Sequence, residues 1–148
     1  KIEEVLPDYQ NVLITHPLFG PQSSKNGTQT TDLSLVVCRV DGNLAELVIS
    51  YCKDYLKLKI IKMDSAEHDR QMANAQALTF FISEALAELK LGDQILKTPS
   101  FEELLDVAHL TEKESADLLS LIQNDNPFAE QIRLKFIDSI NRINNKYT

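Results

Sequence analysis

The hydrophobic pattern divides the chain into a first part with strand-like runs and a second part that is helical throughout. Three short apolar runs, of the length and composition typical of strands, lie at 11–15, 33–40 and 59–63. A helix is expected between the second and third runs, from 43 to about 56. Strand, helix and strand in this order predict a right-handed crossover, which belongs to an open, mixed or parallel α/β sheet.

The helix expected at 43–56 has apolar residues at helical spacing, and Asn43 is positioned to cap it. We predict that one apolar face of this helix packs on a core. Its residues are Leu44, Leu47, Val48, Tyr51 and Tyr55.

Beyond Asp64 the spacing of apolar residues is that of helices. A long helix, capped by Asp64 or Ser65, is predicted to run to about Lys90 with one apolar stripe. The stripe contains Met72, Ala75, Leu78, Ile82, Ala85, Leu86 and Leu89.

Three further helices are predicted from their start signals. Capping boxes at Ser100 with Glu103 and at Thr111 with Glu114 begin two short helices. Asn126-Pro127 begins the last helix. Its predicted buried face comprises Ile132, Phe136, Ile140 and Ile143. The predicted fold class is therefore α+β, with an α/β part at 1–63 followed by an all-helical part at 64–148.

Composition excludes several classes of protein. The chain has 148 residues, 43% of them hydrophobic, which is enough for a core of its own. With 15 basic and 22 acidic side chains the net charge is −7, so no nucleic-acid partner is expected. No apolar run is long enough for a membrane span and no leader opens the chain, so a soluble, cytoplasmic protein is expected. The lack of an initiator Met suggests that polypeptide precedes Lys1.

Two cysteines and the glycines restrict the chemistry further. Cys38 and Cys52 lack the short spacing of a zinc site, so no metal is expected and both are predicted to be reduced thiols. The four glycines lie too far apart for a dinucleotide or P-loop fingerprint. A hydrolase that used His16 with Ser23 or Ser24 would lack the third residue of a catalytic triad.

His16 is the first candidate for chemistry. It follows the run at 11–15 and opens a loop held by Pro17, Gly20 and Pro21. Ligands bind at the carboxyl ends of strands in open α/β sheets, and a neutral imidazole can accept a proton from a hydroxyl group. A histidine that only satisfies loop carbonyl groups remains an equal alternative on these residues.

The other two histidines lie on predicted helices. His68 is in the first turn of the long helix and shares a face with Gln76 and Phe80, so it belongs either to a functional face or to a hydrogen-bonded helix start. His109 ends a short helix, where a structural role is expected.

Two segments together resemble the prephenate and arogenate dehydrogenase family. They are THPLFGP at 15–21 and EHDRQMANAQALT at 67–79, in that order and at matching separation. The run QSSKNG at 22–27 is most similar to the arogenate-using, plant-type branch. The resemblance implies an NAD- or NADP-dependent oxidative decarboxylation of prephenate or arogenate that leads to tyrosine.

The resemblance also implies roles for residues. His16 would be the catalytic base that polarises the 4-hydroxyl group of the substrate, and His68 would belong to the pocket wall. Further substrate-binding residues would be Gly20, Gln22, Lys25, Gln76 and Phe80. Lys25 would attract a carboxylate. Phe80 stands where the family usually has a histidine, and neither Arg133 nor Arg142 can be assigned to the substrate.

At the level of domains, the resemblance implies that 1–63 is the C-terminal part of a Rossmann-type nucleotide-binding domain. Residues 64–148 would then be a helical substrate-binding and dimerisation domain of a homodimer, with the cofactor fingerprint outside this chain. The stripe expected to dimerise contains Met72, Leu78, Ile82, Leu86, Leu89, Phe136 and Ile140. The alternative is a non-catalytic helical interaction module with an α/β cap.

Overall fold

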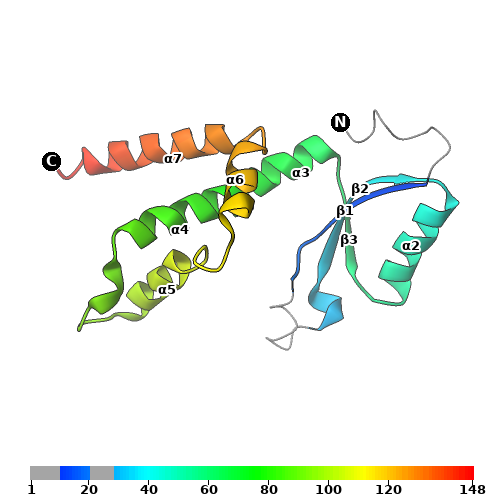
Figure 1. Cartoon of the computed structure of the whole chain (residues 1–148), viewed down its shortest axis with the longest axis horizontal. Coiled ribbons are helices and arrows are strands. Elements are labelled where there is room, and N and C mark those ends of the chain that lie inside the picture. Colours follow the sequence, from blue (N-terminus) through cyan, green and yellow to red (C-terminus); the bar gives the residue numbers. More distant parts are fainter. Residues whose placement is uncertain (1–10, 21–28) are drawn as a thin grey trace. The chain divides into compact units, whose positions relative to one another are not determined.

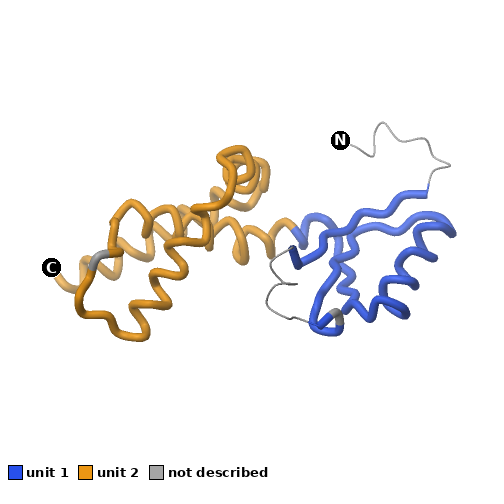
Figure 2. Tube along the Cα trace, turned by 60° about the horizontal axis from the view of Figure 1, so that its bottom comes forward, with its two compact units in different colours: residues 1–68 blue, residues 69–148 orange. Residues whose placement is uncertain are grey.

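The computed structural model describes residues 11–20 and 29–148, which fall into two compact units (Figures 1 and 2). The division lies between His68 and Asp69, inside helix α3 (Ser65–Met72). The first unit contains a small sheet and one helix, and the second unit is helical, so the fold class is α+β as predicted.

The sheet of the first unit has three strands in the order β1-β2-β3. They are β1 (Val12–Pro17), β2 (Ser34–Asp41) and β3 (Lys59–Lys62), and a short 3-10 helix, η2 (Thr30–Asp32), precedes β2. All three predicted strands are confirmed. β1 pairs antiparallel with β2, while β2 and β3 are parallel and joined by α2 (Asn43–Asp54), as expected for a crossover unit. The sheet is therefore mixed.

Helix α2 packs on the sheet through a different face from the one we predicted. Ala45 is buried, and Ile49 and Cys52 pack against a core cluster of Leu35, Val37 and Leu58. The predicted core face is wrong, because its residues are between 41% and 72% exposed; they are Leu44, Leu47, Val48, Tyr51 and Tyr55. Both sides of α2 are apolar, and the small side chain of Ala45 favours close approach on its own side.

The start of α2 is capped from a distant part of the chain. The backbone N–H of Leu44 donates to Oδ1 of Asn11 at 3.0 Å, so the prediction that Asn43 caps this helix is wrong. Gly42 precedes the helix at φ +87°, and a Cβ there would lie 2.2 Å from Asn11 Oδ1. Only glycine fits this turn without strain, because L side chains disfavour positive φ.

The second unit begins with one long helical run. The run comprises α3, the π-helical segment η3 (Ala73–Ala77) and α4 (Leu78–Glu88). Asp64 caps it, since Oδ1 of Asp64 accepts the N–H of Glu67 at 2.8 Å, and the run ends close to the predicted Lys90.

The π-helical segment changes which residues are buried. A π turn contains an extra residue and rotates the following helix relative to the preceding one. The buried positions are Ala73, Ala77 and Ser83. The predicted stripe is therefore wrong at Ala75, Ala85 and Leu89, which are exposed, while its other members are half-buried.

The remaining helices of the second unit follow after the short 3-10 helix η4 (Leu91–Asp93). They are α5 (Pro99–Ala108), α6 (Ala116–Asn124) and α7 (Ala129–Asn144). Both predicted capping boxes are wrong. Helix α5 is capped by Thr98, whose hydroxyl oxygen accepts the N–H of Phe101 at 3.3 Å, and Pro99 occupies the first helical position. Helix α6 is capped by Ser115. Thr111 is instead buried.

Helix α7 begins two residues after Pro127, where Oδ1 of Asn126 accepts the N–H of Phe128 at 2.9 Å. Its predicted face is partly confirmed. Ile132 and Phe136 are half-buried, and the Phe136 ring meets the edge of Phe81 with centroids 6.4 Å apart. Ile140 and Ile143, however, are 48% and 49% exposed.

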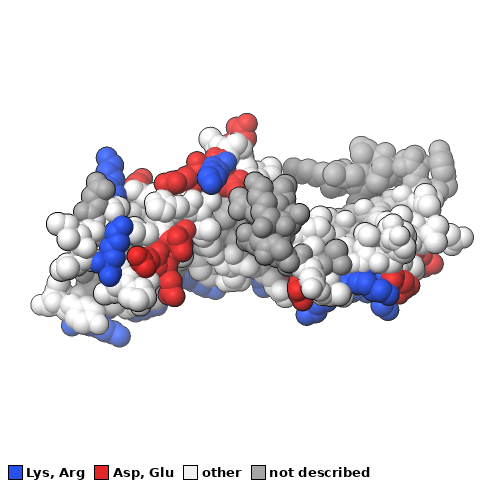
Figure 3. Space-filling model, turned by 90° about the horizontal axis from the view of Figure 1, so that it is seen from below, with Lys and Arg blue, Asp and Glu red and all other residues white. Residues whose placement is uncertain are grey.

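Figure 3 shows the charged side chains on one face of the molecule. Lys and Arg side chains are interspersed with Asp and Glu on the face seen in Figure 3, without a continuous basic area. Within the described ranges, no helix has the length and apolar character that crossing a membrane requires.

Candidate active site

His16 lies near the carboxyl end of β1, as predicted, but that end is not at the expected edge of the sheet. Ligand binding at carboxyl ends is a property of parallel strands. Since β1 is antiparallel, its end lies beside the start of β2, where Pro17 pairs with Leu35 and Ser34 pairs with Lys59 of β3. Contrary to the prediction, His16 therefore does not lie at the edge where the carboxyl ends of the parallel strands meet.

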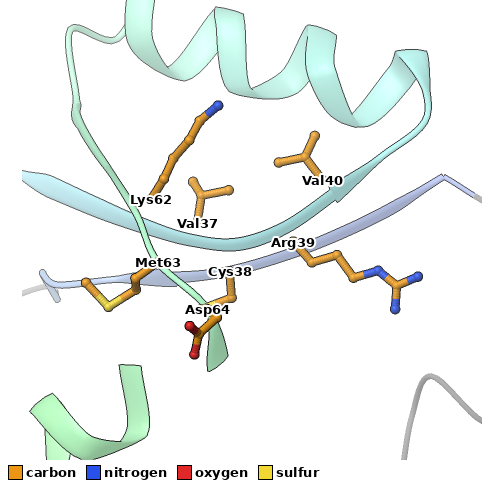
Figure 4. A pocket seen from close by; sticks show the side chains of 7 residues that line it. All are labelled: Val37, Cys38, Arg39, Val40, Lys62, Met63 and Asp64. Atoms are coloured by element: carbon orange, nitrogen blue, oxygen red, sulfur yellow. The ribbon is translucent and has the colours of Figure 1, made fainter. Parts of the chain in front are cut away.

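The position of His16 on a sheet face is more informative. His16 pairs with Val36, and directly paired residues project to the same face of a sheet. Leu35 and Val37, the neighbours of Val36, belong to the core under α2, so Val36 projects to the other face. Figure 4 shows the same alternation further along β2, with Val37 directed to α2 and Cys38 away from it. His16 therefore lies on the sheet face opposite α2.

His68 meets His16 on this face. Nε2 of His68 lies 2.9 Å from Nδ1 of His16, and the rings meet edge to face at 77° with centroids 5.1 Å apart. The Asp64 cap fixes the first turn of α3, in which the N–H of His68 donates to the Asp64 carbonyl at 3.0 Å. Both histidines belong to the first unit.

This contact was not predicted. Helical spacing relates His68 only to residues of its own helix, whereas His16 is 52 positions away. The sequence contained one signal, namely that each of the two family-like segments includes a histidine.

The surroundings keep His16 neutral. Partial burial lowers the pKa of His16 below its ordinary value of 6.5, and a positive charge on His68 lowers the pKa further. A neutral imidazole has one N–H and one nitrogen lone pair. At physiological pH the ring can therefore accept a proton from a hydroxyl group.

The other predicted site residues do not all belong to the described part of the unit that contains this histidine pair. Gly20 is exposed, and a Cβ added to it would meet nothing within 4 Å. Gln22 and Lys25 lie outside the described residues, as do Ser23 and Ser24. Gln76 in η3 and Phe80 in α4 are half-buried residues of the second unit.

The arginines and His109 have structural contacts. Nη1 of Arg133 donates to the carbonyl and to Oε1 of Gln123 at 2.7 and 2.8 Å, and Gln123 in turn donates to the carbonyl of Ala77 at 2.8 Å. Arg142 is paired with Asp138 on the surface. His109 is exposed and lies 3.7 Å from a carboxylate oxygen of Glu112, as expected for a structural role.

A shallow depression of about 420 Å³ lies where the parallel strands β2 and β3 end (Figure 4). Two of its charged side chains have partners, because Arg39 pairs with Asp41 and Asp64 caps α3; the third charged residue of its lining is Lys62. Cys38 and Cys52 form no disulfide. Among the described residues no group of three side chains is suited to hold a metal ion.

Helix α2 follows strand β2, as the phosphate-binding helix of a dinucleotide site follows its strand. The pyrophosphate of NAD requires a glycine-rich turn and open N–H groups at a helix N-terminus that follows a strand. Helix α2 follows β2 through Gly42, but Asn11 occupies the turn and bonds the N–H of Leu44. The start of α2 is therefore not a phosphate site.

Comparison with known proteins identifies two relatives in Arabidopsis thaliana, and no protein-family model matches the chain. The chain is 31% identical over 121 residues to arogenate dehydrogenase 1, chloroplastic, a match of 78% of this chain and 19% of the relative. It is 28% identical over 130 residues to arogenate dehydrogenase 2, chloroplastic, covering 84% of this chain and 36% of the relative. The chain thus spans about a fifth and about a third of these proteins.

Proposed function

The chain is related to the prephenate and arogenate dehydrogenase family, and we propose that it supplies the catalytic base of such an enzyme. The reaction would be the oxidative decarboxylation of arogenate or prephenate in tyrosine biosynthesis. The observation that carries this proposal is the neutral imidazole of His16, held by His68, in a chain with these relatives.

The proposed role of His16 follows from the proton balance of the reaction. The substrate ring loses a hydride and carbon dioxide and becomes a phenol, so the hydroxyl hydrogen is still present in the product. His16 would accept this proton at Nε2 while the carbon–hydrogen bond at the same carbon breaks, and would return it to the phenol oxygen. A base whose pKa lies below 6.5 suits this step because it is unprotonated when the substrate arrives.

The substrate pocket is proposed from the family resemblance. By this resemblance, Gly20, Gln22 and Lys25 would contact the substrate, as would Gln76 and Phe80. Phe80 cannot donate a hydrogen bond, so its contact with the substrate would be apolar. Both relatives are named as arogenate dehydrogenases, and the run at 22–27 resembles the same branch, so we propose arogenate as the preferred substrate.

The test is turnover of the full-length protein that contains this chain. Purified protein would be assayed with arogenate and with prephenate, each with NAD and with NADP, by the absorbance of the reduced cofactor. We expect turnover with arogenate. Absence of cofactor reduction with every combination would contradict the proposed function.

The NAD or NADP that takes the hydride is proposed to bind elsewhere in the full-length protein, in a Rossmann-type domain to which residues 1–63 would contribute the last strands. We expect the isolated chain to bind no NAD(H) in calorimetry at micromolar concentrations, because Asn11 blocks the start of α2. Micromolar affinity of the isolated chain would show that the cofactor site has been misplaced.

The helical part, 64–148, is proposed to form a homodimer. Of the stripe predicted to dimerise, Leu89 and Ile140 are 62% and 48% exposed. Leu134 and Ile137, which the prediction omitted, are also exposed, and obligate interfaces are built from such apolar surfaces. The described structure thus leaves much of α7 available to a second copy.

We expect light scattering to give twice the mass of one chain, and Ile137→Asp with Ile140→Asp to give the mass of a monomer. The matched control replaces Gln131 and Asn141, polar residues of the same helix, with Asp. A monomeric wild-type chain at high micromolar concentration would contradict the proposed dimer.

The alternative function, a non-catalytic interaction module, is favoured by the exposed apolar face of α2. Turnover of the full-length protein separates the two, because an interaction module would have none. A cytoplasmic location stays a prediction from composition, whereas both relatives are named chloroplastic.

A further inference from the structure

We propose that His68 is the positioning residue of the catalytic base: its Nε2 accepts a hydrogen bond from the Nδ1–H of His16 and so holds His16 in the tautomer whose Nε2 can accept a proton. This inference rests on the proposed function of His16. This role differs from the two roles expected from the sequence, in which His68 belongs to a hydrogen-bonded helix start or to the pocket wall.

His16 and His68 share one proton in their contact. Two imidazole nitrogens 2.9 Å apart are joined by one hydrogen, which belongs to one of the two rings. If His68 were the donor, a neutral His16 would carry its own hydrogen on Nε2. That nitrogen could then donate to a substrate hydroxyl group but could not accept its proton. Only the arrangement with His16 as donor leaves a base.

The hydrogen bond to His68 also favours one orientation of the His16 ring. Rotating the His16 ring by half a turn about the Cβ–Cγ bond would exchange Nδ1 for a carbon atom and break the bond to His68. A hydrogen bond of this kind contributes about 1 kcal/mol, enough to favour one orientation several-fold. Because α3 is capped by Asp64, the acceptor itself is held in place.

His68 would also stabilise the charge that develops on His16 during the reaction. When His16 accepts the hydroxyl proton it becomes an imidazolium ion, and its bond to the neutral His68 becomes a stronger, charge-assisted hydrogen bond. The proton must return to the phenol oxygen at the end of the reaction. A neutral acceptor stabilises the imidazolium less than a carboxylate would, so it assists proton transfer without trapping the proton.

The tautomers can be measured directly in the 148-residue chain, which contains only three histidines. Nitrogen-15 labelling of the imidazoles distinguishes protonated from unprotonated ring nitrogens by NMR at pH 8. We expect Nδ1–H and unprotonated Nε2 in both His16 and His68. In His68→Leu we expect the Nδ1–H tautomer of His16 to be lost, while the exposed His109 keeps its spectrum.

Kinetics of the full-length enzyme provide the second measurement. His68→Leu removes the acceptor, and we expect kcat to fall by about 10-fold to 100-fold, the usual effect of losing a group that orients a functional histidine, with little change in KM. His68→Gln places a carbonyl oxygen near the position of Nε2 and should recover most of the loss. His109→Gln is the matched control and should leave kcat unchanged.

The outcomes separate the two proposals. An His16 protonated on Nε2 in the wild type, an unchanged kcat in His68→Leu, or an equal loss in the Leu and Gln variants would each overturn the positioning role while leaving His16 as the base. Absence of turnover in the wild-type enzyme would overturn the proposed function itself, and with it the catalytic meaning of the pair.

Discussion

If the proposed function holds, replacing His16 with Asn in the full-length protein is expected to lower kcat by roughly 100-fold to 10,000-fold, the usual contribution of a positioned general base. Asn has a polar group near the position of Nδ1 but nothing in place of Nε2. The variant can therefore keep a hydrogen bond to His68 while losing the nitrogen proposed to accept the hydroxyl proton. The loss would be measured as turnover of arogenate under saturating substrate and cofactor.

The same variant should change the pH dependence of turnover. Because burial and the neighbouring His68 lower the pKa of His16 from its ordinary value, the base stays unprotonated to more acidic pH than an ordinary histidine would. The wild-type enzyme should thus show an acidic limb of kcat/KM below pH 6.5, since protonated His16 cannot act as a base. In His16→Asn this limb should be absent.

His109→Asn provides the control for the loss of a histidine, because His109 is exposed and paired only with Glu112 among the described contacts. Its turnover and pH profile should match those of the wild type. Near-normal turnover of His16→Asn on both arogenate and prephenate would contradict the assignment of the base, and the relationship to the family would then extend to the fold alone.

Replacing Ser83 with Ala is expected to destabilise the helical unit by about 2 to 4 kcal/mol. Ser83 is fully buried in α4, where its hydroxyl group is 3.2 Å from the carbonyl of Ala108 and accepts from the N–H of Thr111 at 3.3 Å. The Thr111 hydroxyl lies 3.0 Å from the same oxygen. Alanine fits the space but leaves these groups buried without a partner, and each unsatisfied group costs about 1–3 kcal/mol.

Denaturant unfolding followed by circular dichroism would measure this loss as a lower midpoint at an unchanged slope. Ser50→Ala is the matched control, since Ser50 is an exposed residue of α2 and its replacement should change stability by less than about 0.5 kcal/mol. An equal effect of the two substitutions would show that the contacts of Ser83 do not hold α4 to the segment after α5.

Local patterns were sufficient for the existence of most elements. The β-branched runs became β1, β2 and β3, and Asp64 became the cap of α3, because strand propensity and capping depend on residues a few positions apart. The two family-like segments were recognisable for the same reason. Both curated relatives support the resemblance that these segments suggested.

Local sequence patterns were insufficient where two faces of one helix could pack on the core, or where one side chain had two possible hydrogen-bond partners. Helix α2 has apolar residues on both sides, so periodicity alone did not decide that Ala45 would face the sheet and Tyr55 the solvent. Thr111 has the spacing of a cap, but the buried hydroxyl of Ser83 is a partner that satisfies it better. In both cases the choice depended on a neighbour far away in the chain.

The residues by themselves therefore determined the order of strands and helices and identified His16 and His68 as members of two separate segments. Only the tertiary structure decided that β1 runs antiparallel to β2, which places His16 on the sheet face opposite α2. It also decided that His68 reaches His16 across 52 positions. The physical reason is that strand direction and contacts between distant side chains depend on how complete elements pack, whereas periodicity records only which side of one element is apolar.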